Sequence, residues 1–337
     1  MSPTLPDPLL SDWIPYKLSV DDGQLTVRWL FIGDNRFTEP FFDETIIRCK
    51  SYPYNTTRWH AVSTVAGLID AAERRSAVEP TAFIFHVSRC GSTLLSQLLA
   101  IPDQHIVLSE VPLIDELLRL PYSPLANSLS TADREAALRA VIGWLGAKRT
   151  GNETRLFIKM DSWNLFFHET IRRLYPTVPF ILLYRSPDDV VRSHQKRRGM
   201  QAVPGLIQPE LFGFDPAMAT SPDLDGYTAA VLDRYLQTML TVARTDSRAW
   251  LLNYQANGAA MLDQLLHFLS IDVDPTDKIS MMQRSHYHAK YPDQPFDETR
   301  PQQPVPAYLE SAMNRYRQLD EARQTSYSFP PIRFINE

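Results

Sequence analysis

The residues with the clearest chemical potential form one short turn, SRCGST, at positions 88–93. An apolar stretch precedes the turn and an amphipathic stretch follows it, which predicts a strand that leads into a helix. The amino terminus of a helix presents unpaired N–H groups and a partial positive charge, so it suits an anion. Gly91 would let the backbone approach a phosphate closely, and the hydroxyls of Ser92 and Thr93 add donors.

The turn lacks the lysine of nucleoside triphosphate loops. In the Walker pattern a glycine stands five residues before the second glycine, and a lysine follows the second. Here those positions hold His86 and Ser92, so an ATP or GTP loop is disfavoured. Arg89 stands inside the turn, where it could reach a bridging oxygen or a leaving phosphate. A cysteine-phosphatase loop is also disfavoured, because Ser96 stands where that loop needs arginine after Cys90. The remaining alternative is a structural turn with capping hydroxyls.

A second candidate anion ligand follows the apolar stretch PFILLY. Arg185 comes directly after this stretch, and Ser193 comes eight positions later inside a predicted helix. Ligands of open α/β sheets bind at the carboxyl ends of the strands, which is where Arg185 is expected. The other basic residues of this helix are interpreted as a solvated helix end that complements the helix dipole.

Two more residues with acid–base or charge-stabilising potential stand where predicted strands end. Glu110 follows HIVLS, and Lys159 ends the stretch LFIK. A lysine after mostly apolar strand residues is hard to place in a core without an anion. A carboxylate at the same edge of the sheet could serve as a general base. For Glu110 the structural alternative is a helix-capping carboxylate before Pro112.

From residue 81 onward, short apolar stretches alternate with amphipathic ones. This alternation predicts a three-layer α/β fold of the P-loop type, with a central parallel sheet flanked by helices. The predicted strands cover 82–87, 105–108, 155–160, 179–184 and 248–253, and the predicted helices cover 91–100, 111–119, 131–148, 163–174, 187–198, 226–244, 257–269 and 306–323.

Residues 1–80 are expected to be a β-rich N-terminal extension that packs on a main domain, 81–337. Within the extension, QLTVRWLFIG alternates as a strand does, and residues 58–75 are expected to be helical. The aromatic segment RFTEPFFDETI predicts a β-hairpin. The functional alternative is that this segment covers the site at which an acceptor substrate binds. Residues 200–225 are rich in proline and glycine and predict a long loop.

The bulk properties describe an ordinary soluble globular protein. The 337 residues are 44% hydrophobic and 22% charged, and the formal net charge of −5 disfavours a general nucleic-acid binder. Two cysteines are too few for a disulfide framework, and no apolar stretch is long enough to span a membrane. The first residues do not follow a signal-peptide pattern, so we expect a cytoplasmic location. His286 and His288 lack further ligands at metal spacing, so no metal site is expected.

Together the motifs resemble those of sulfotransferases that use 3′-phosphoadenosine-5′-phosphosulfate (PAPS). Residues 88–95 are similar to the loop that holds the 5′-phosphosulfate, in the Arg-x-Gly-Ser/Thr-Thr-Leu form of bacterial and protein-tyrosine sulfotransferases. Arg185 and Ser193 reproduce the arginine–serine pair that binds the 3′-phosphate in that family. The resemblance covers about 81–200 and is thinner over 226–295, and the family's glycine-rich C-terminal nucleotide loop is not recognisable.

The resemblance implies roles for particular residues. Glu110 would be the base, and Lys159 and Arg89 would stabilise charge during transfer to a hydroxyl or amine of a small-molecule acceptor, with no metal required. The expected contacts of PAPS, and of its product 3′-phosphoadenosine-5′-phosphate (PAP), are Arg89, Cys90, Gly91, Ser92, Thr93, Leu94, Arg185, Ser193, Tyr287 and Lys290.

Two other functions are compatible with the same loop. One is a small-molecule kinase on a related P-loop sheet, and the other is a non-catalytic nucleotide-binding protein. No motif in the sequence indicates which acceptor the protein would use. The sequence also leaves the oligomeric state open, a homo-oligomer included.

Overall fold

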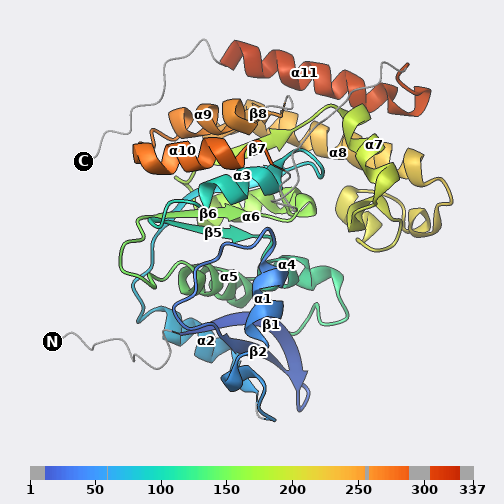
Figure 1. Cartoon of the computed structure of the whole chain (residues 1–337). Coiled ribbons are helices and arrows are strands. Elements are labelled where there is room, and N and C mark those ends of the chain that lie inside the picture. The colour runs from blue at the N-terminus through green and yellow to red at the C-terminus, as the bar shows by residue number, and fades with distance from the viewer. Residues whose placement is uncertain (1–11, 59, 255–257, 288–303, 327–337) are drawn as a thin grey trace. The chain divides into compact units, whose positions relative to one another are not determined.

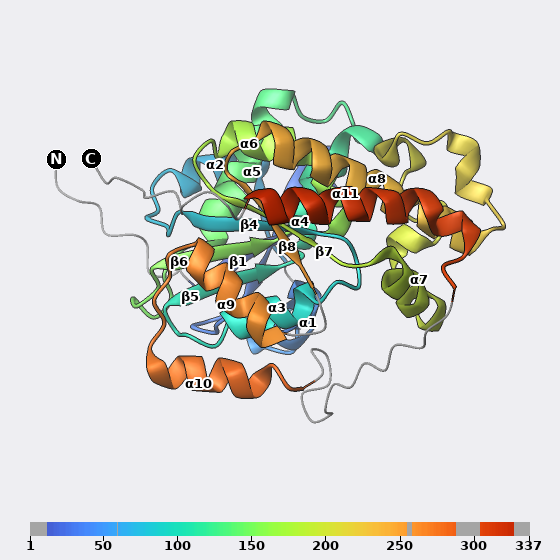
Figure 2. The same cartoon turned by 90° about the horizontal axis from the view of Figure 1, so that it is seen from above.

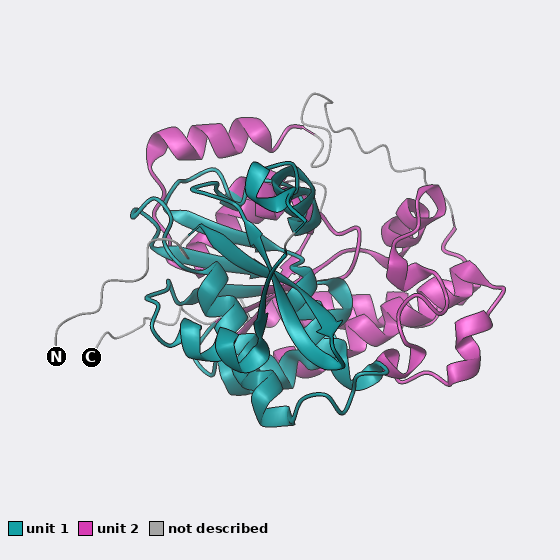
Figure 3. Cartoon of the chain, turned by 90° about the horizontal axis from the view of Figure 1, so that it is seen from below, with its two compact units in different colours: residues 1–83, 99–178 teal, residues 84–98, 179–337 magenta. Residues whose placement is uncertain are grey.

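The computed structural model describes residues 12–58, 60–254, 258–287 and 304–326 (Figure 1). The chain divides into two compact units, coloured in Figure 3. Unit 1 comprises Met1–Phe83 and Leu99–Val178, and unit 2 comprises Ile84–Leu98 and Pro179–Glu337. The division that the sequence suggests, into an N-terminal extension 1–80 and a main domain 81–337, stays a prediction.

The central sheet has five strands in the order β5-β6-β4-β7-β8, and the α/β fold predicted from the sequence is confirmed. In unit 1, β5 and β6 run parallel in a register that pairs Ser109 with Lys159. In unit 2, β7 and β8 run parallel and pair Tyr184 with Asn253. Nearly every strand residue is buried, as central parallel strands require. The strands are β4 (Pro80–His86), β5 (His105–Ser109), β6 (Arg155–Lys159), β7 (Phe180–Tyr184) and β8 (Ala249–Asn253).

A separate antiparallel sheet confirms the β-rich character of the N-terminal residues. It consists of β1 (Trp13–Asp21), β2 (Gln24–Phe31) and β3 (Ala61–Thr64), in that order. The helix expected over 58–75 is wrong in its first part, because the alternating residues of β3 pair with β2. Helix α2 (Val65–Ala72) begins only where the Thr64 hydroxyl accepts the backbone N–H of Gly67 and so caps the helix.

The β-hairpin expected in the aromatic segment is also wrong. Residues Phe42–Cys49 form helix α1. Phe42, Ile46 and Cys49 are buried, and their spacing places them on one helical face. Asp43 and Glu44 occupy the first turn, where negative charge favours a helix. The helical period of the buried residues therefore outweighs the β propensity of the aromatic ones.

Within unit 1, helices α4 (Pro112–Arg119) and α5 (Thr131–Leu145) lie between strands β1–β2 and strands β5–β6 (Figure 1). Two hydrogen bonds fasten these helices to β1. The Trp144 indole donates to the carbonyl of Trp13 at 2.7 Å, and the backbone N–H of Leu18 donates to the Glu116 carboxylate at 2.6 Å. The Ser130 hydroxyl accepts the N–H of Asp133 and so caps the amino end of α5. The segment predicted as helix 163–174 is a 3₁₀ turn (Ser162–Phe167) followed by α6 (His168–Leu174).

In unit 2, helix α11 lies along helix α8 (Figure 2). The carboxylate of Asp320 on α11 accepts hydrogen bonds from the Tyr184 hydroxyl at 2.9 Å and the Asn253 amide at 2.8 Å, which fixes α11 to β7 and β8. The predicted loop 200–225 contains three short 3₁₀ turns. The helices of this unit are α3 (Ser92–Leu99), α7 (Pro187–Lys196), α8 (Leu224–Thr245), α9 (Gly258–Phe268), α10 (Pro275–Arg284) and α11 (Glu310–Ser326).

Two buried histidines predict how stability depends on pH. Burial, together with the charges of nearby arginines, lowers the pKa of His105 and of His194 from 6.5 to about 4. Between these values the unfolded chain binds protons that the folded protein does not, so stability is full above pH 6.5 and is lost as the pH falls toward 4. Each group contributes about 3 kcal/mol to this loss. Urea unfolding at pH 7.5 and 4.5 measures the loss, and His105→Gln should reduce it. An unchanged difference between the two pH values in that variant would contradict the prediction.

Candidate functional site

The turn after β4 has an unusual backbone. Arg89 has φ of 60° and Gly91 has φ of 80°, so two residues of the turn adopt the left-handed conformation. Such conformations within a short turn aim successive N–H groups to one side and create an anion-binding concavity. Helix α3 begins at Ser92, within this segment, and adds its own unpaired amino-terminal N–H groups. A backbone of this form could hold an anion, and the binding of an anion by this turn stays a prediction.

Gly91 is required by its surroundings as well as by its φ. A Cβ at this position would lie 2.7 Å from the ring of Tyr254, which is closer than real Cβ atoms approach. The same ring lies 5.2 Å from the Arg185 guanidinium, in a cation–π contact. Tyr254 thus packs against the turn and against the arginine that the sequence assigns to the 3′-phosphate.

The side chains of the turn divide into buried and accessible ones. Cys90 and Leu94 are buried, so only their backbone N–H groups could serve an anion. The Ser92 hydroxyl is also buried and lies 3.3 Å from Nδ1 of His86. The half-buried Thr93 has no side-chain hydrogen bond among the residues that the structure describes, so its hydroxyl is available to a ligand.

Arg185 is fixed in place by unit 2 itself. Its side chain is only 7% exposed, its Nε lies 3.3 Å from a carboxylate oxygen of Asp189, and its Nη1 donates to the backbone carbonyl of Arg89 at 3.1 Å. The Arg89 guanidinium in turn donates to the carbonyl of Arg197 at 2.5 Å. These contacts hold the two predicted anion ligands of unit 2 to each other.

The other predicted nucleotide contacts differ in their burial and in whether the structure describes them. Ser193 lies on α7, is half-buried, and has no side-chain hydrogen bond within the described parts of the chain. Tyr287 is 42% exposed and follows α10. Lys290 lies outside the described residues.

In unit 1, Lys159 and Glu110 form a close ion pair. The Lys159 side chain is completely buried, the Glu110 side chain is 22% exposed, and Nζ lies 2.5 Å from Oε1. The backbone N–H of Glu110 also donates to the carbonyl of Lys159 at 2.8 Å. Glu110 has φ of 57°, the left-handed region that non-glycine residues rarely adopt. The pair therefore places an acid–base group and a cation together at the carboxyl ends of β5 and β6.

The N-terminal residues contribute to the surroundings of this pair. The ring of Phe41 lies 5.0 Å from the Lys159 ammonium in a cation–π contact. Asp43, at the start of α1, has a raised pKa because its carboxyl is partly removed from water and because the negative charge of Glu110 repels its own. A carboxyl beside Glu110 and an aromatic ring over Lys159 extend the site beyond the two predicted residues.

Sequence reasoning missed Tyr254, Asp189 and Phe41. Asp189 lies four positions after Arg185, a spacing that could have suggested the ion pair. Phe41 was noted only as part of an aromatic segment. Nothing in the local sequence of Tyr254 links it to residue 91, because packing alone brings the two together.

Two general properties follow from the described residues. None of the helices described is long and apolar enough to cross a membrane. No group of three or more histidine, cysteine, aspartate or glutamate side chains within the described ranges is arranged to hold a metal ion.

The sequence matches no family model and no curated protein. Solved structures of sulfotransferases are similar to it. The sulfotransferase domain of a Synechococcus olefin synthase is 19% identical over 76% of this chain and 98% of its own, with a TM-score of 0.43. The sulfotransferase domain of the curacin biosynthetic pathway is 17% identical over 73% and 99%, with a TM-score of 0.46. A mouse sulfotransferase complexed with PAP is 12% identical over 80% and 90%, with a TM-score of 0.36.

These structures are less than 20% identical to this chain and their TM-scores lie below 0.5, so they assign it neither a family nor an activity. The parallel sheet confirms the α/β fold expected from the sequence, and the resemblance to sulfotransferases stays a prediction. The donor, the acceptor and the individual site residues stay predictions.

Removing one member of the Glu110–Lys159 pair should destabilise the protein strongly. Glu110→Gln leaves a fully buried ammonium without its counter-charge, which costs about 3 kcal/mol. Lys159→Met should cost less, because the carboxylate that it leaves behind is partly exposed. Urea unfolding of both single variants and the double variant measures the coupling between the two side chains, and the double variant should be more stable than the sum of the single losses implies. Additive losses would show that the two groups do not depend on each other.

Proposed function

We propose that this protein transfers a sulfuryl group from PAPS to a hydroxyl or amine of a small-molecule acceptor. The observation that carries the proposal is the left-handed backbone conformation of two predicted site residues, Arg89 and Glu110. The non-glycine residues with positive φ in the described ranges are Asp22, Arg89, Glu110 and Ser270, and Arg89 and Glu110 are two of the three residues to which the sequence gives a catalytic role. Strained backbone of this kind is typical of functional sites.

Unit 2 supplies residues that fit the phosphate and sulfate groups of PAPS. The left-handed residues at 89 and 91 and the start of α3 offer backbone N–H groups, and the Thr93 hydroxyl adds a donor. We assign these groups to the 5′-phosphosulfate. Arg185 and Ser193 are assigned to the 3′-phosphate, for which a fixed guanidinium is well suited because it binds phosphate oxygens in pairs.

Unit 1 supplies the acid–base group and a second cation. PAPS would supply the activated sulfuryl group. Glu110 would accept the proton that the acceptor O–H or N–H loses as its oxygen or nitrogen bonds to sulfur. Lys159 and Arg89 would stabilise the negative charge that develops on the sulfuryl and leaving oxygens as the bond to the bridging oxygen breaks. PAP would then remain as the product.

The type of transfer, two further phosphate contacts and the location belong to the same proposal. Ser92 stands where a kinase P-loop carries lysine, which favours sulfuryl over phosphoryl transfer. Tyr287 and Lys290 remain candidate phosphate contacts, and a cytoplasmic location remains our expectation.

Binding of PAP tests the nucleotide assignment. Ser193→Ala removes a half-buried hydroxyl without disturbing a described hydrogen bond, and it should weaken PAP binding severalfold while AMP binding stays the same. Arg185→Lys keeps a charge but loses the paired donors, and it should weaken PAP binding by about tenfold or more, again without a matching loss for AMP. Calorimetric titration of both nucleotides measures the difference.

The exposed Arg244 on α8 provides the control, because Arg244→Lys should leave both affinities unchanged. Equal losses for PAP and AMP would count against the 3′-phosphate assignment. Thermal stabilisation by ATP with Mg²⁺ and none by PAP would favour a kinase instead.

Transfer activity tests the role of Glu110. A panel of phenols, alcohols and amines is incubated with PAPS, and mass spectrometry detects the gain of one SO₃ unit. Glu110→Gln should lower the rate by about 100-fold or more, because it removes the base, while PAP binding is retained. Circular dichroism confirms that the variant is folded, and Glu169→Gln, an exposed substitution in unit 1, is the matched control. A variant that retains full activity would remove Glu110 from the mechanism.

A further inference from the structure

Unit 1 contains a pocket of about 350 Å³ that none of the residues discussed so far lines. Three segments form its wall, at 77–80, 139–143 and 174–178. Pro80 is the first residue of β4, so the pocket lies at the amino end of that strand. Glu110 and Lys159 follow or end their strands at the carboxyl side. The pocket is therefore separate from the ion pair of the same unit.

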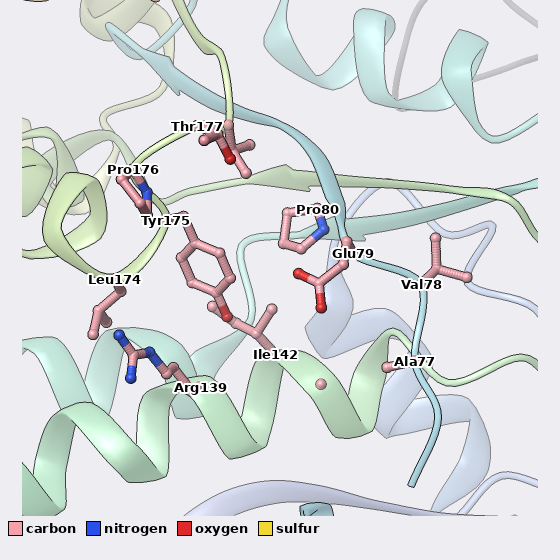
Figure 4. Close-up of a pocket in the computed structure, with 12 residues that line it drawn as sticks. Ala77, Val78, Glu79, Pro80, Arg139, Ile142, Leu174, Tyr175, Pro176 and Thr177 are labelled. Atoms are coloured by element: carbon pink, nitrogen blue, oxygen red, sulfur yellow. The ribbon is translucent and has the colours of Figure 1, made fainter. Parts of the chain in front are cut away.

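Three polar groups face one another across this pocket. Figure 4 shows the Arg139 guanidinium and the Glu79 carboxylate on opposite sides of the Tyr175 hydroxyl. Burial raises the pKa of Tyr175, the charge of Glu79 raises it further, and the charge of Arg139 opposes that rise, so both charges act on the hydroxyl. In the described parts of the chain, Glu79 and Arg139 form no ion pair, and the Tyr175 hydroxyl has no hydrogen-bond partner.

Most of the remaining lining is apolar, and several of its residues are buried. Val78, Leu174 and Val178 are buried core residues, and Pro80 and Ile142 add further apolar surface. The Tyr175 ring packs against the ring of Phe83 with 5.2 Å between centroids, which fixes its direction. A concave apolar surface with a few convergent polar groups is the usual form of a small-molecule site.

We propose that this pocket binds a small zwitterion with an apolar body, of the α-amino acid class. The Arg139 guanidinium would pair with the carboxylate, to which the Tyr175 hydroxyl would also donate. The Glu79 carboxylate would pair with the ammonium group, and the apolar body would rest on Pro80 and Ile142. A ligand with a single charge would pair with only one of the two protein charges and would leave the other without a partner. A ligand that carries both charges is therefore needed.

Three compounds that share one aromatic body test the proposal on the full chain. L-Phenylalanine carries both charges, phenethylamine lacks the carboxylate, and 3-phenylpropionate lacks the ammonium group. Calorimetric titration should show saturable binding of phenylalanine, with each analogue at least about tenfold weaker. This test uses no sulfuryl donor, so its outcome is independent of the function proposed above.

Two variants with matched controls assign each charge. Arg139→Gln should reduce phenylalanine binding to the level of phenethylamine, and Glu79→Gln should reduce it to the level of 3-phenylpropionate. Arg134→Gln on the same helix and Glu73→Gln after α2 line no part of the pocket and should change nothing. Both pocket residues are exposed, so their variants should fold.

Three results would overturn the proposal. The first is no saturable binding of phenylalanine up to about 10 mM. The second is equal affinity for all three compounds, which would mean that the pocket does not distinguish the charges of the ligand. The third is phenylalanine binding that survives in both Arg139→Gln and Glu79→Gln.

Discussion

The burial of one ammonium group is the constraint on which the arrangement of unit 1 depends. The Lys159 side chain is 0% exposed, and a buried charge without a partner is strongly unfavourable. The parallel register of β5 and β6 brings the chain of Glu110 beside Lys159, and the left-handed backbone of Glu110 accompanies the close ion pair. Phe41 then covers the ammonium from the N-terminal segment. The segment that contains Phe41 and the start of α1 therefore belongs to the surroundings of this pair.

Unit 2 meets a different constraint, which is the strain of the turn after β4. The left-handed backbone of Arg89 persists only if its surroundings over-determine it. The ring of Tyr254 fills the space beside Gly91, and the Arg185 guanidinium donates to the carbonyl of Arg89. Asp189 holds Arg185 in turn. The groups that would bind an anion are thus fixed by unit 2 before any ligand arrives, which lowers the entropic cost of binding.

The two ends of the strands in unit 1 differ in how their charges are used. At the carboxyl end, Glu110 and Lys159 neutralise each other at hydrogen-bond distance. At the amino end, Glu79 and Arg139 face one pocket without forming an ion pair in the described part of the chain. The first arrangement suits chemistry on a bound group, because the charges are fixed and mostly removed from water. The second suits recognition, because a ligand that carries both signs could pair with both charges.

The sequence by itself determined the alternation of strands and helices, the turn after β4 and the charged residues at strand ends, because period and burial are local properties of the chain. It misjudged α1, where the burial of one helical face outweighed local propensity, and it missed β3, which forms by pairing with β2. Only the tertiary structure decided that Tyr254 packs on Gly91, that Phe41 covers Lys159 and that Glu79 and Arg139 share a pocket. These contacts join residues far apart in the chain, and no periodicity encodes them.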